Sequence, residues 1–312
     1  MARSIRVGYG EHISKKGQEN SQIILLEADL ADSTQSEPFQ NAFPDRYFQI
    51  GIAEQNMVGM AAGLSLEGKL PIVNSFAAFI AMRACEQVRT DVAYPNLNVK
   101  FVVSHAGVSA GSAGPTHHTY EDIAIMRSIP NMTVCVPGDV REMRQVIDSA
   151  LENHGPYYIR ISAIDIDDTY EKDDKFVLGK ATLLEDGNDL TIITTGTMMN
   201  EGKEIVNNLL KEGINARLLQ MASIKPIDKD AIISAAEETG KIFTIEEHNI
   251  IGGLGSAVAE VLAEAKAGTM LKRFGFNDTF CDVGGDPAFL LDRAGLSSTK
   301  LTKQILEDLN NK

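Results

Sequence analysis

Residues 46–68, RYFQIGIAEQNMVGMAAGLSLEG, contain the stretch on which the predicted fold depends. Positions 47–52 predict a short apolar strand, which a glycine interrupts. Positions 57–66 predict a helix with almost no polar residue, so we expect this helix to be buried inside the fold. Gly59 and Gly63 are four residues apart and share one helix face, where a second backbone can approach closely. Glu54 departs from this pattern because its carboxylate stands between two segments that are both expected to be buried.

The pattern alone leaves two interpretations of Glu54 open. An acidic residue in the first turn of a helix stabilises the helix dipole, and such residues are common. A buried carboxylate that points at a ligand can instead hold or share a proton, which is a frequent arrangement in active sites.

Composition limits the class of protein. The 312 residues are enough for two domains with full cores, and 44% hydrophobic with 23% charged residues is typical of a globular protein. A net charge of −14 argues against a general binder of nucleic acid or anionic membranes, although it leaves room for a small basic pocket that holds one phosphate. No apolar run approaches the length of a membrane span. Three widely separated cysteines favour a reduced, cytoplasmic protein: Cys85, Cys135 and Cys281.

Strands and helices alternate along the chain. Aliphatic runs predict strands in the first half, and 31–46 predicts a loop rich in turn formers. A second alternating unit follows an acidic segment, so we predict an α/β fold with two domains, 1–165 and 188–312, joined by a linker at 166–187. Each domain should be a mainly parallel sheet covered by helices. Four side chains follow or close strands and can therefore meet at one edge of the first sheet: Glu54, Phe76, His105 and Arg160.

Several motifs of the first half resemble the pyrimidine-binding domain of transketolases. They are GIAEQNM (51–57), FAAFIAMRACEQVR (76–89), the long segment 104–131 with its GPTH motif, and YYIRIS (157–162). The second half resembles the carboxyl-terminal domain of the same family. The resemblance implies thiamine diphosphate as cofactor, with Glu54 facing its aminopyrimidine ring. It also implies that Phe76 and Phe79 form the ring's pocket and that Asp29 lies near the cofactor; without it, both phenylalanines would be ordinary core residues.

The resemblance also implies how a sugar phosphate is held. Arg6, Ser33, His105 and Arg160 match positions that contact the phosphate, although any one of them alone could be an ordinary surface group. His117 matches a histidine that contacts the donor's carbonyl and hydroxyl oxygens and takes part in catalysis. The three histidines of this loop lack the spacing of a zinc site, so we predict no metal ligands in this chain. His118 has no counterpart in the family and is expected to be structural.

Two departures from the family pattern bear on function. Ala113 stands where many transketolases have an aspartate that binds a sugar hydroxyl, which makes an altered or branched donor such as apulose 4-phosphate plausible. The chain also lacks the GDG motif and the following asparagine that hold the diphosphate through Mg²⁺. We therefore expect half of an active site, in the carboxyl-terminal subunit of a split transketolase. An amino-terminal partner subunit would hold the diphosphate and Mg²⁺, and the assembly would be a heterotetramer with two copies of each subunit.

Two alternatives remain open at this point. One is the β subunit of another thiamine enzyme, such as a 2-oxoacid dehydrogenase, which has the same pair of domains. The other is a non-catalytic subunit that only stabilises its partner. Residues 252–257, GGLGSA, lack the spacing of the dinucleotide fingerprint, so we predict no nicotinamide site there.

Overall fold

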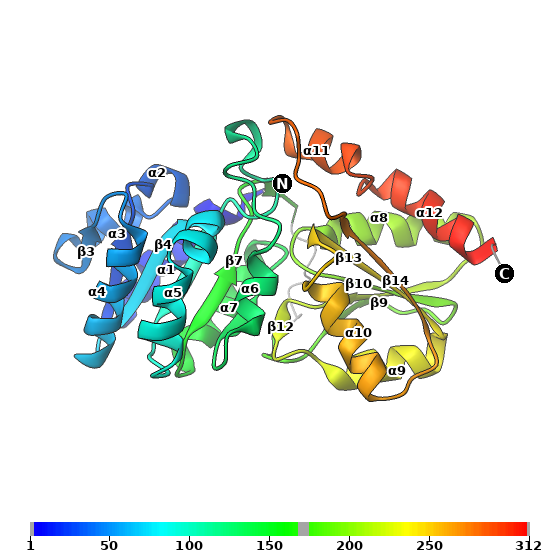
Figure 1. Cartoon of the computed structure of the whole chain (residues 1–312), viewed down its shortest axis with the longest axis horizontal. Helices are drawn as coiled ribbons and strands as arrows, with labels where there is room; N and C mark the ends of the chain where they lie inside the picture. Colours follow the sequence, from blue (N-terminus) through cyan, green and yellow to red (C-terminus); the bar gives the residue numbers. More distant parts are fainter. Residues whose placement is uncertain (1–2, 168–174, 311–312) are drawn as a thin grey trace.

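The aliphatic runs of the sequence form two separate sheets in the computed structural model, which describes residues 3–167 and 175–310. The two sheets and their helices lie side by side, with most of the first in blue to green and the second in yellow-green to red (Figure 1). None of the helices in the described residues combines the length and the apolar character that crossing a membrane requires.

The first sheet has seven strands, and its four central strands are buried along their full length because helices cover both faces. All neighbours are parallel except the first pair. In spatial order the strands are β12 (Ser223–Lys225), β6 (Thr133–Cys135), β7 (Tyr157–Arg160), β5 (Lys100–Ser104), β4 (Leu70–Phe76), β2 (Ile23–Glu27) and β3 (Tyr47–Gln49).

Alternate residues of these strands pack against helices on opposite faces. Leu25 belongs to the cluster formed with α1 (Ile5–Glu19), α3 (Glu37–Ala42) and α7 (Val140–Glu152). Its neighbour Leu26 belongs to the cluster on the other face. The helices of that face are α4 (Glu54–Leu66), η2 (Phe79–Arg83), α5 (Cys85–Gln87), η3 (Val88–Ala93) and α6 (Asp122–Ser128).

The second sheet has five strands, of which only β9 runs antiparallel to its neighbour among the pairs described. The order is β14 (Met270–Phe276), β13 (Lys241–Asn249), β10 (Leu190–Thr194), β11 (Ala216–Gln220) and β9 (Thr182–Glu185). One face packs on α8 (Met198–Lys211), α11 (Pro287–Arg293) and α12 (Ser298–Asn310), and the other on α9 (Lys229–Thr239) and α10 (Leu254–Glu264). A small ribbon pairs β1 (Arg3–Ser4) with β8 (Asp165–Ile166).

The predicted fold class is confirmed, since both sheets are mainly parallel and covered by helices. The predicted domain limits stay a prediction. Residues 168–174 of the expected linker lie outside the described residues, whereas β9, which also falls within 166–187, belongs to the second sheet. The strand β12 comes from the second half of the chain but pairs with β6 in the first sheet.

The predicted loop at 31–46 was wrong, because this segment forms α2 (Ala31–Thr34), α3 and η1 (Pro44–Arg46). Phe39 is fully buried against α1 and anchors α3, which has a proline in its first turn. Arg46 closes the segment, since its guanidinium lies 4.0 Å from the centroid of the Phe43 ring and donates to the Gly17 carbonyl. Turn-forming residues were present, but burial of one aromatic side chain decided the local structure.

The prediction that the helix at 57–66 is buried throughout was also wrong. Met57 and Val58 face the core, but the opposite side of α4 is open to solvent, with Leu66 at 71% exposure. A Cβ atom added to Gly59 or Gly63 would meet nothing within 4 Å. The strand before it is likewise a short edge strand, β3, rather than a buried one. The apolar outer face of α4 therefore has no covering in the described residues of this chain.

Candidate active site

Four aromatic side chains that the sequence predicts for the site meet at the carboxyl-terminal edge of the first sheet. Phe76 ends β4, Phe79 begins the short π-helix η2, and His105 and His117 belong to the loop after β5. The rings of Phe76 and Phe79 stack with centroids 5.5 Å apart and planes inclined by 17°. His105 lies on Phe76 at 3.9 Å between centroids, and His117 meets Phe79 edge-on at 5.4 Å. These rings form an aromatic wall, and the face of a single ring in it suits a planar heteroaromatic ligand.

Glu54 is joined to this wall by an arginine. It begins α4 and is 1% exposed, and Nη1 of Arg83 donates to both of its carboxylate oxygens at 2.8 Å. The same guanidinium lies over the ring of Phe79, with Cζ 4.4 Å from the centroid. We call the space between the Glu54 carboxylate and the face of the Phe79 ring the slot; in this structure the guanidinium of Arg83 occupies it.

The opposite end of the site is polar and positively charged. Nη1 of Arg6 donates to the Ser33 carbonyl at 2.6 Å, and Nη2 donates to the Ala163 carbonyl at 3.4 Å. Burial lowers the pKa of Arg6, although Asp165 and Asp32 oppose this effect. The cluster of Arg6 with Ser33 and the neighbouring His105 is the part of the site that can receive an anion.

His105 is held in an unusual backbone conformation. Its φ of 55° lies in the left-handed region, and its Nδ1 is 2.9 Å from the hydroxyl of Ser104. Burial lowers the pKa of His105 to about 3, and electrostatic interactions with Arg6 and His117 add to this effect. The ring is therefore neutral near pH 7 and can donate one N–H.

A buried acid supports the loop that follows β2. Glu27 accepts hydrogen bonds from the hydroxyls of Thr34 at 2.7 Å and Ser36 at 2.8 Å, and burial raises its pKa to about 7. The same stretch of chain includes Asp29 and, within α2, Ser33. Asp29 is exposed and has a φ of 61°, and its N–H donates to Oε1 of Gln49. Its predicted place near the cofactor stays a prediction.

Arg160 does not join this group. It is 5% exposed, and its Nε donates to Asp122 at 2.8 Å while Nη2 donates to the Glu247 carbonyl at 2.9 Å. These donors face the interior between the two sheets, so its placement gives no support to the predicted phosphate contact. His118 is buried and braces its own loop through the Tyr120 hydroxyl and the Gly111 carbonyl, as a structural residue would.

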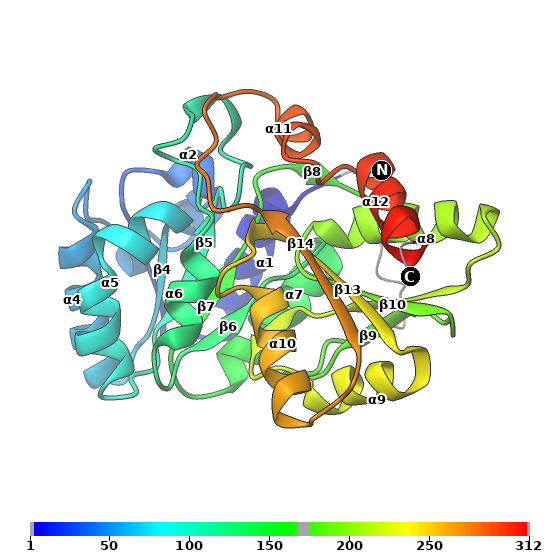
Figure 2. The ribbon, with the colours of Figure 1, turned by 45° about the vertical axis from the view of Figure 1, so that its right-hand side comes forward.

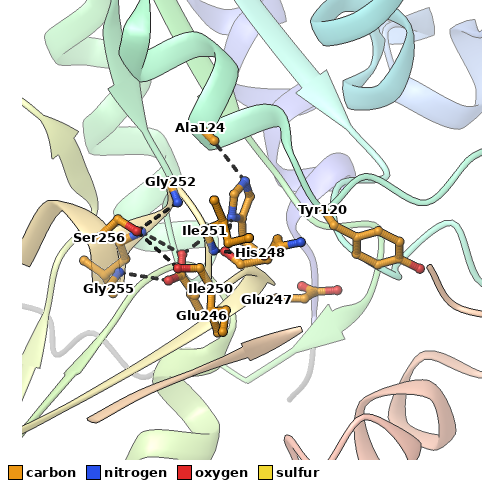
Figure 3. A network of polar contacts seen from close by, with 12 residues as sticks. Tyr120, Ala124, Glu246, Glu247, His248, Ile250, Ile251, Gly252, Gly255 and Ser256 are labelled. Carbon is orange, nitrogen blue, oxygen red and sulfur yellow. Dashed lines mark hydrogen bonds and ion pairs between the residues drawn. The ribbon is translucent and has the colours of Figure 1, made fainter. Parts of the chain in front are cut away.

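Figure 3 shows the polar network at the junction of the two halves. Nε2 of His248, on β13, accepts from the N–H of Ala124 in α6, and Nδ1 is 2.7 Å from the Asn249 carbonyl. Burial lowers the pKa of His248 to about 4, which agrees with a neutral ring that donates from Nδ1. Glu246 accepts from the N–H groups of Leu254 and Gly255 and so caps α10 (Figure 3). A carboxylate of the chain itself thus occupies the glycine-rich helix start.

The neighbouring carboxylate, Glu247, reaches the loop that carries the site histidines. Its Oε1 accepts from the Val108 N–H at 2.7 Å, and its Oε2 is 3.4 Å from the Thr197 hydroxyl. Gly107 has a φ of 62°, and a Cβ atom there would come within 2.2 Å of Glu247. The segment between β14 and α11 lies beside the same loop (Figure 2), and the Gly285 N–H donates to the Gly111 carbonyl. The second half of the chain therefore positions part of the site.

The slot opens into a cleft of about 450 Å³, lined in part by Phe79, Arg83, Thr116 and Phe280. Within residues 3–167 and 175–310, no group of three or more His, Cys, Asp or Glu side chains is placed to bind a metal ion.

Two family patterns match this chain over most of its length. Residues 2–166 match the transketolase pyrimidine-binding domain, and residues 179–301 match the transketolase C-terminal domain. The chain belongs to the transketolase family.

Relatives of similar length show which section of a transketolase this chain corresponds to. A protein of Methanocaldococcus jannaschii named as a transketolase C-terminal section is 43% identical over 309 residues, which cover 98% of this chain and 96% of the relative. The 6-deoxy-6-sulfo-D-fructose transketolase subunit of Clostridium sp. (strain MSTE9) is 39% identical, with coverage of 96% and 92%. A solved split-gene transketolase, described as an inactive beta4 tetramer, is 41% identical with a TM-score of 0.89, and 98% of each chain is covered. This chain thus corresponds to the C-terminal section of a split transketolase.

Sequence reasoning missed three residues of this transketolase site. Arg83 follows Phe79 by four positions, so helical spacing could have placed the two together, but its pairing with Glu54 spans 29 residues. Glu27 sits inside an aliphatic strand and gave no signal of its loop contacts. Glu247 acts across 139 residues through the Val108 N–H, which no local pattern can predict.

Proposed function

We propose that this chain is the catalytic C-terminal subunit of a split transketolase that uses thiamine diphosphate and Mg²⁺. The subunit pair would transfer a two-carbon ketol unit from a ketose phosphate to an aldose phosphate. The observation that supports this best is the buried carboxylate of Glu54, which a single guanidinium links to the ring of Phe79 in the aromatic wall. The guanidinium of Arg83 supports it further, since this planar cation lies on Phe79 and pairs with Glu54. An aminopyrimidine ring would bind through the same two contacts, a flat apolar surface for its face and a carboxylate for a protonated ring nitrogen.

The chain's own residues would divide the work at this site. When bound, thiamine diphosphate would supply the electron sink for cleavage of the donor's carbon–carbon bond. Glu54 would hold a proton at its carboxylate against the pyrimidine nitrogen, out of contact with water. Phe76 and Phe79 would orient the ring, and His117 would contact the donor's oxygens and move a proton there.

The anion-binding end would hold the substrate phosphate. Arg6 supplies a charge next to Ser33, and the neutral ring of His105 can donate an N–H, with its orientation set by Ser104. Asp29 would lie near the cofactor, on the same stretch of chain as Ser33.

A partner subunit would complete the site. The sequence lacks the residues that the family uses to hold diphosphate and Mg²⁺. The chain covers 47% of the chain of a solved transketolase of Campylobacter jejuni, with which it shares the fold at a TM-score of 0.82 and 21% identity. The bare apolar face of α4, next to Glu54, is where we propose that an amino-terminal subunit docks, in a heterotetramer with two copies of each chain.

The donor is proposed to be an altered ketose rather than an ordinary pentose or hexose phosphate. Ala113 is exposed and offers no acceptor where the family aspartate binds a sugar hydroxyl. Relatives act on unusual sugars, since one is the sulfofructose enzyme above and another is an apulose-4-phosphate transketolase subunit of Phocaeicola vulgatus, 40% identical over 83% of this chain and 83% of its own length.

Reconstitution tests this proposal. Calorimetry with thiamine diphosphate and Mg²⁺, and a turnover assay on a panel of ketose phosphates and sulfofructose, would be run on the isolated chain and on its mixture with a candidate amino-terminal subunit. We expect weak cofactor binding and no turnover by the chain alone. In the mixture, we expect tight cofactor binding and turnover to appear together. Tight binding with full turnover by the isolated chain would contradict the half-site. Cofactor binding without turnover on any sugar would favour a non-catalytic subunit.

A further inference from the structure

Arg83 occupies the place that the proposed function assigns to the aminopyrimidine ring. Its guanidinium is flat and cationic, and it donates to both oxygens of Glu54 at 2.8 Å. It also lies 4.4 Å from the centroid of the Phe79 ring. The guanidinium and a cofactor ring cannot lie on the same face of Phe79 and contact the same carboxylate together.

We propose that Arg83 is a latch, which fills the slot in the cofactor-free chain and rotates out before thiamine diphosphate binds. This inference rests on the proposed function, because it takes the slot to be the pyrimidine site.

The contacts of Arg83 suit a side chain that can leave. Its side chain is 47% exposed, and Glu54 is its one hydrogen-bonded side-chain partner among the residues that the structure describes. Its backbone is held independently, since Nε2 of Gln55 donates to the Arg83 carbonyl at 3.1 Å. Rotation about the side-chain bonds alone would therefore open the slot and place the guanidinium in solvent.

The latch has a physical reason. A buried carboxylate without a partner is strongly destabilising, so Glu54 needs a cation until the cofactor arrives. The same pairing lowers the apparent affinity for the cofactor, because only the fraction of molecules with an open slot can bind. Removing the latch should therefore tighten binding, which is the opposite of what removal of a cofactor contact would do.

The test compares Arg83→Met with wild type and with Arg89→Met, an exposed arginine further along the same helical segment. One probe is 4-amino-5-hydroxymethyl-2-methylpyrimidine, the pyrimidine half of the cofactor, titrated calorimetrically into the isolated full chain. The second is thiamine diphosphate with Mg²⁺, titrated into the reconstituted complex. We expect Arg83→Met to bind both probes about tenfold more tightly, in line with release of a competing internal ligand, and Arg89→Met to match wild type.

Each outcome decides a different point. Unchanged or weaker binding by Arg83→Met overturns the latch, whereas a wild-type complex that binds no thiamine diphosphate overturns the proposed function. If Arg83→Met does not fold, Arg83→Lys replaces it, since lysine keeps a charge near Glu54 but lacks the flat group that stacks on Phe79. A smaller gain in affinity is then expected, and no gain overturns the latch.

Discussion

At the scale of single residues, Glu54 combines features that rarely occur together in a purely structural acid. It begins a helix, is almost completely buried, and pairs with Arg83, whose guanidinium lies over the Phe79 ring. We predict that Glu54→Gln lowers turnover of the subunit pair by at least ~100-fold, the usual scale for a group that handles a proton. The control is Glu86→Gln, an exposed acid on the neighbouring segment, which should keep full turnover. Steady-state assays decide, and near-normal turnover in a folded Glu54→Gln complex would remove Glu54 from the mechanism.

Ala113 also acts at the scale of a single residue, because its effect on specificity depends on one hydrogen bond to a sugar hydroxyl. We predict that Ala113→Asp raises activity on ordinary pentose phosphates relative to the native donor by about 10- to 100-fold, the worth of one charge-assisted hydrogen bond. The adjacent and equally exposed Ser112→Asp is the control and should leave the ratio unchanged. Competition assays across a panel of sugar phosphates measure the ratio of activity on pentose phosphates to activity on the native donor. A flat ratio would place Ala113 outside the donor pocket.

His105 makes a prediction about pH. Its native pKa of about 3 lies below the ordinary value of 6.5, so the unfolded chain binds more protons between these values. The contribution of His105 to stability is therefore fully present above about pH 6.5 and is lost as pH falls below it. Urea unfolding from pH 7 to pH 4 should show a shallower loss of stability in His105→Asn, because asparagine tolerates the left-handed backbone and does not titrate. Parallel curves for variant and wild type would contradict the assignment.

At the scale of elements, the loop after β5 is shaped by a contact from the other half of the chain. Gly107→Ala introduces both a strained backbone and a collision with Glu247. Gly114→Ala is the matched control, since its φ of 83° is also left-handed but its added Cβ would meet nothing within 4 Å. We expect Gly107→Ala to lose about 1–3 kcal/mol of unfolding free energy and Gly114→Ala to lose clearly less. Thermal unfolding of the isolated chain provides the measurement, and equal losses would show that the Glu247 contact does not shape the loop.

The elements also show which parts of the structure the sequence could predict. Aliphatic runs such as the one in β2 predicted strands because continuous burial leaves a continuous apolar sequence. The segment containing α3 was misjudged because its turn residues are local, whereas burial of Phe39 depends on α1. The motifs assigned Phe76, Phe79 and His105 to one site, and the structure brings their rings into contact. They gave no sign of the inward contacts of Arg160, since a strand end that carries an arginine has the same sequence pattern whether the side chain turns outward or inward.

At the scale of the whole molecule, the outer face of α4 is expected to be an assembly surface. Gly63→Trp should leave the isolated chain folded, because an added side chain meets open space there. It should nevertheless prevent formation of the active complex by blocking close approach of the amino-terminal subunit. Gly268→Trp is a control at another open glycine, far along the chain near β14, and should assemble normally. Analytical ultracentrifugation of each variant with the partner measures this, and normal assembly of Gly63→Trp would place the interface elsewhere.

The short strand β12 limits how this chain can be divided further. It completes the first sheet from the second half of the sequence, and Nζ of Lys225 donates to the carbonyls of Arg127 and Ile129. A fragment that ends before β12 would expose the open edge of β6, and such edges recruit foreign strands. Gene fission between the two halves would thus produce pieces that must be made together to stay in solution. A transketolase can be divided into separate polypeptides. A further division of this chain between β6 and β12 would replace one subunit with two pieces that must fold together.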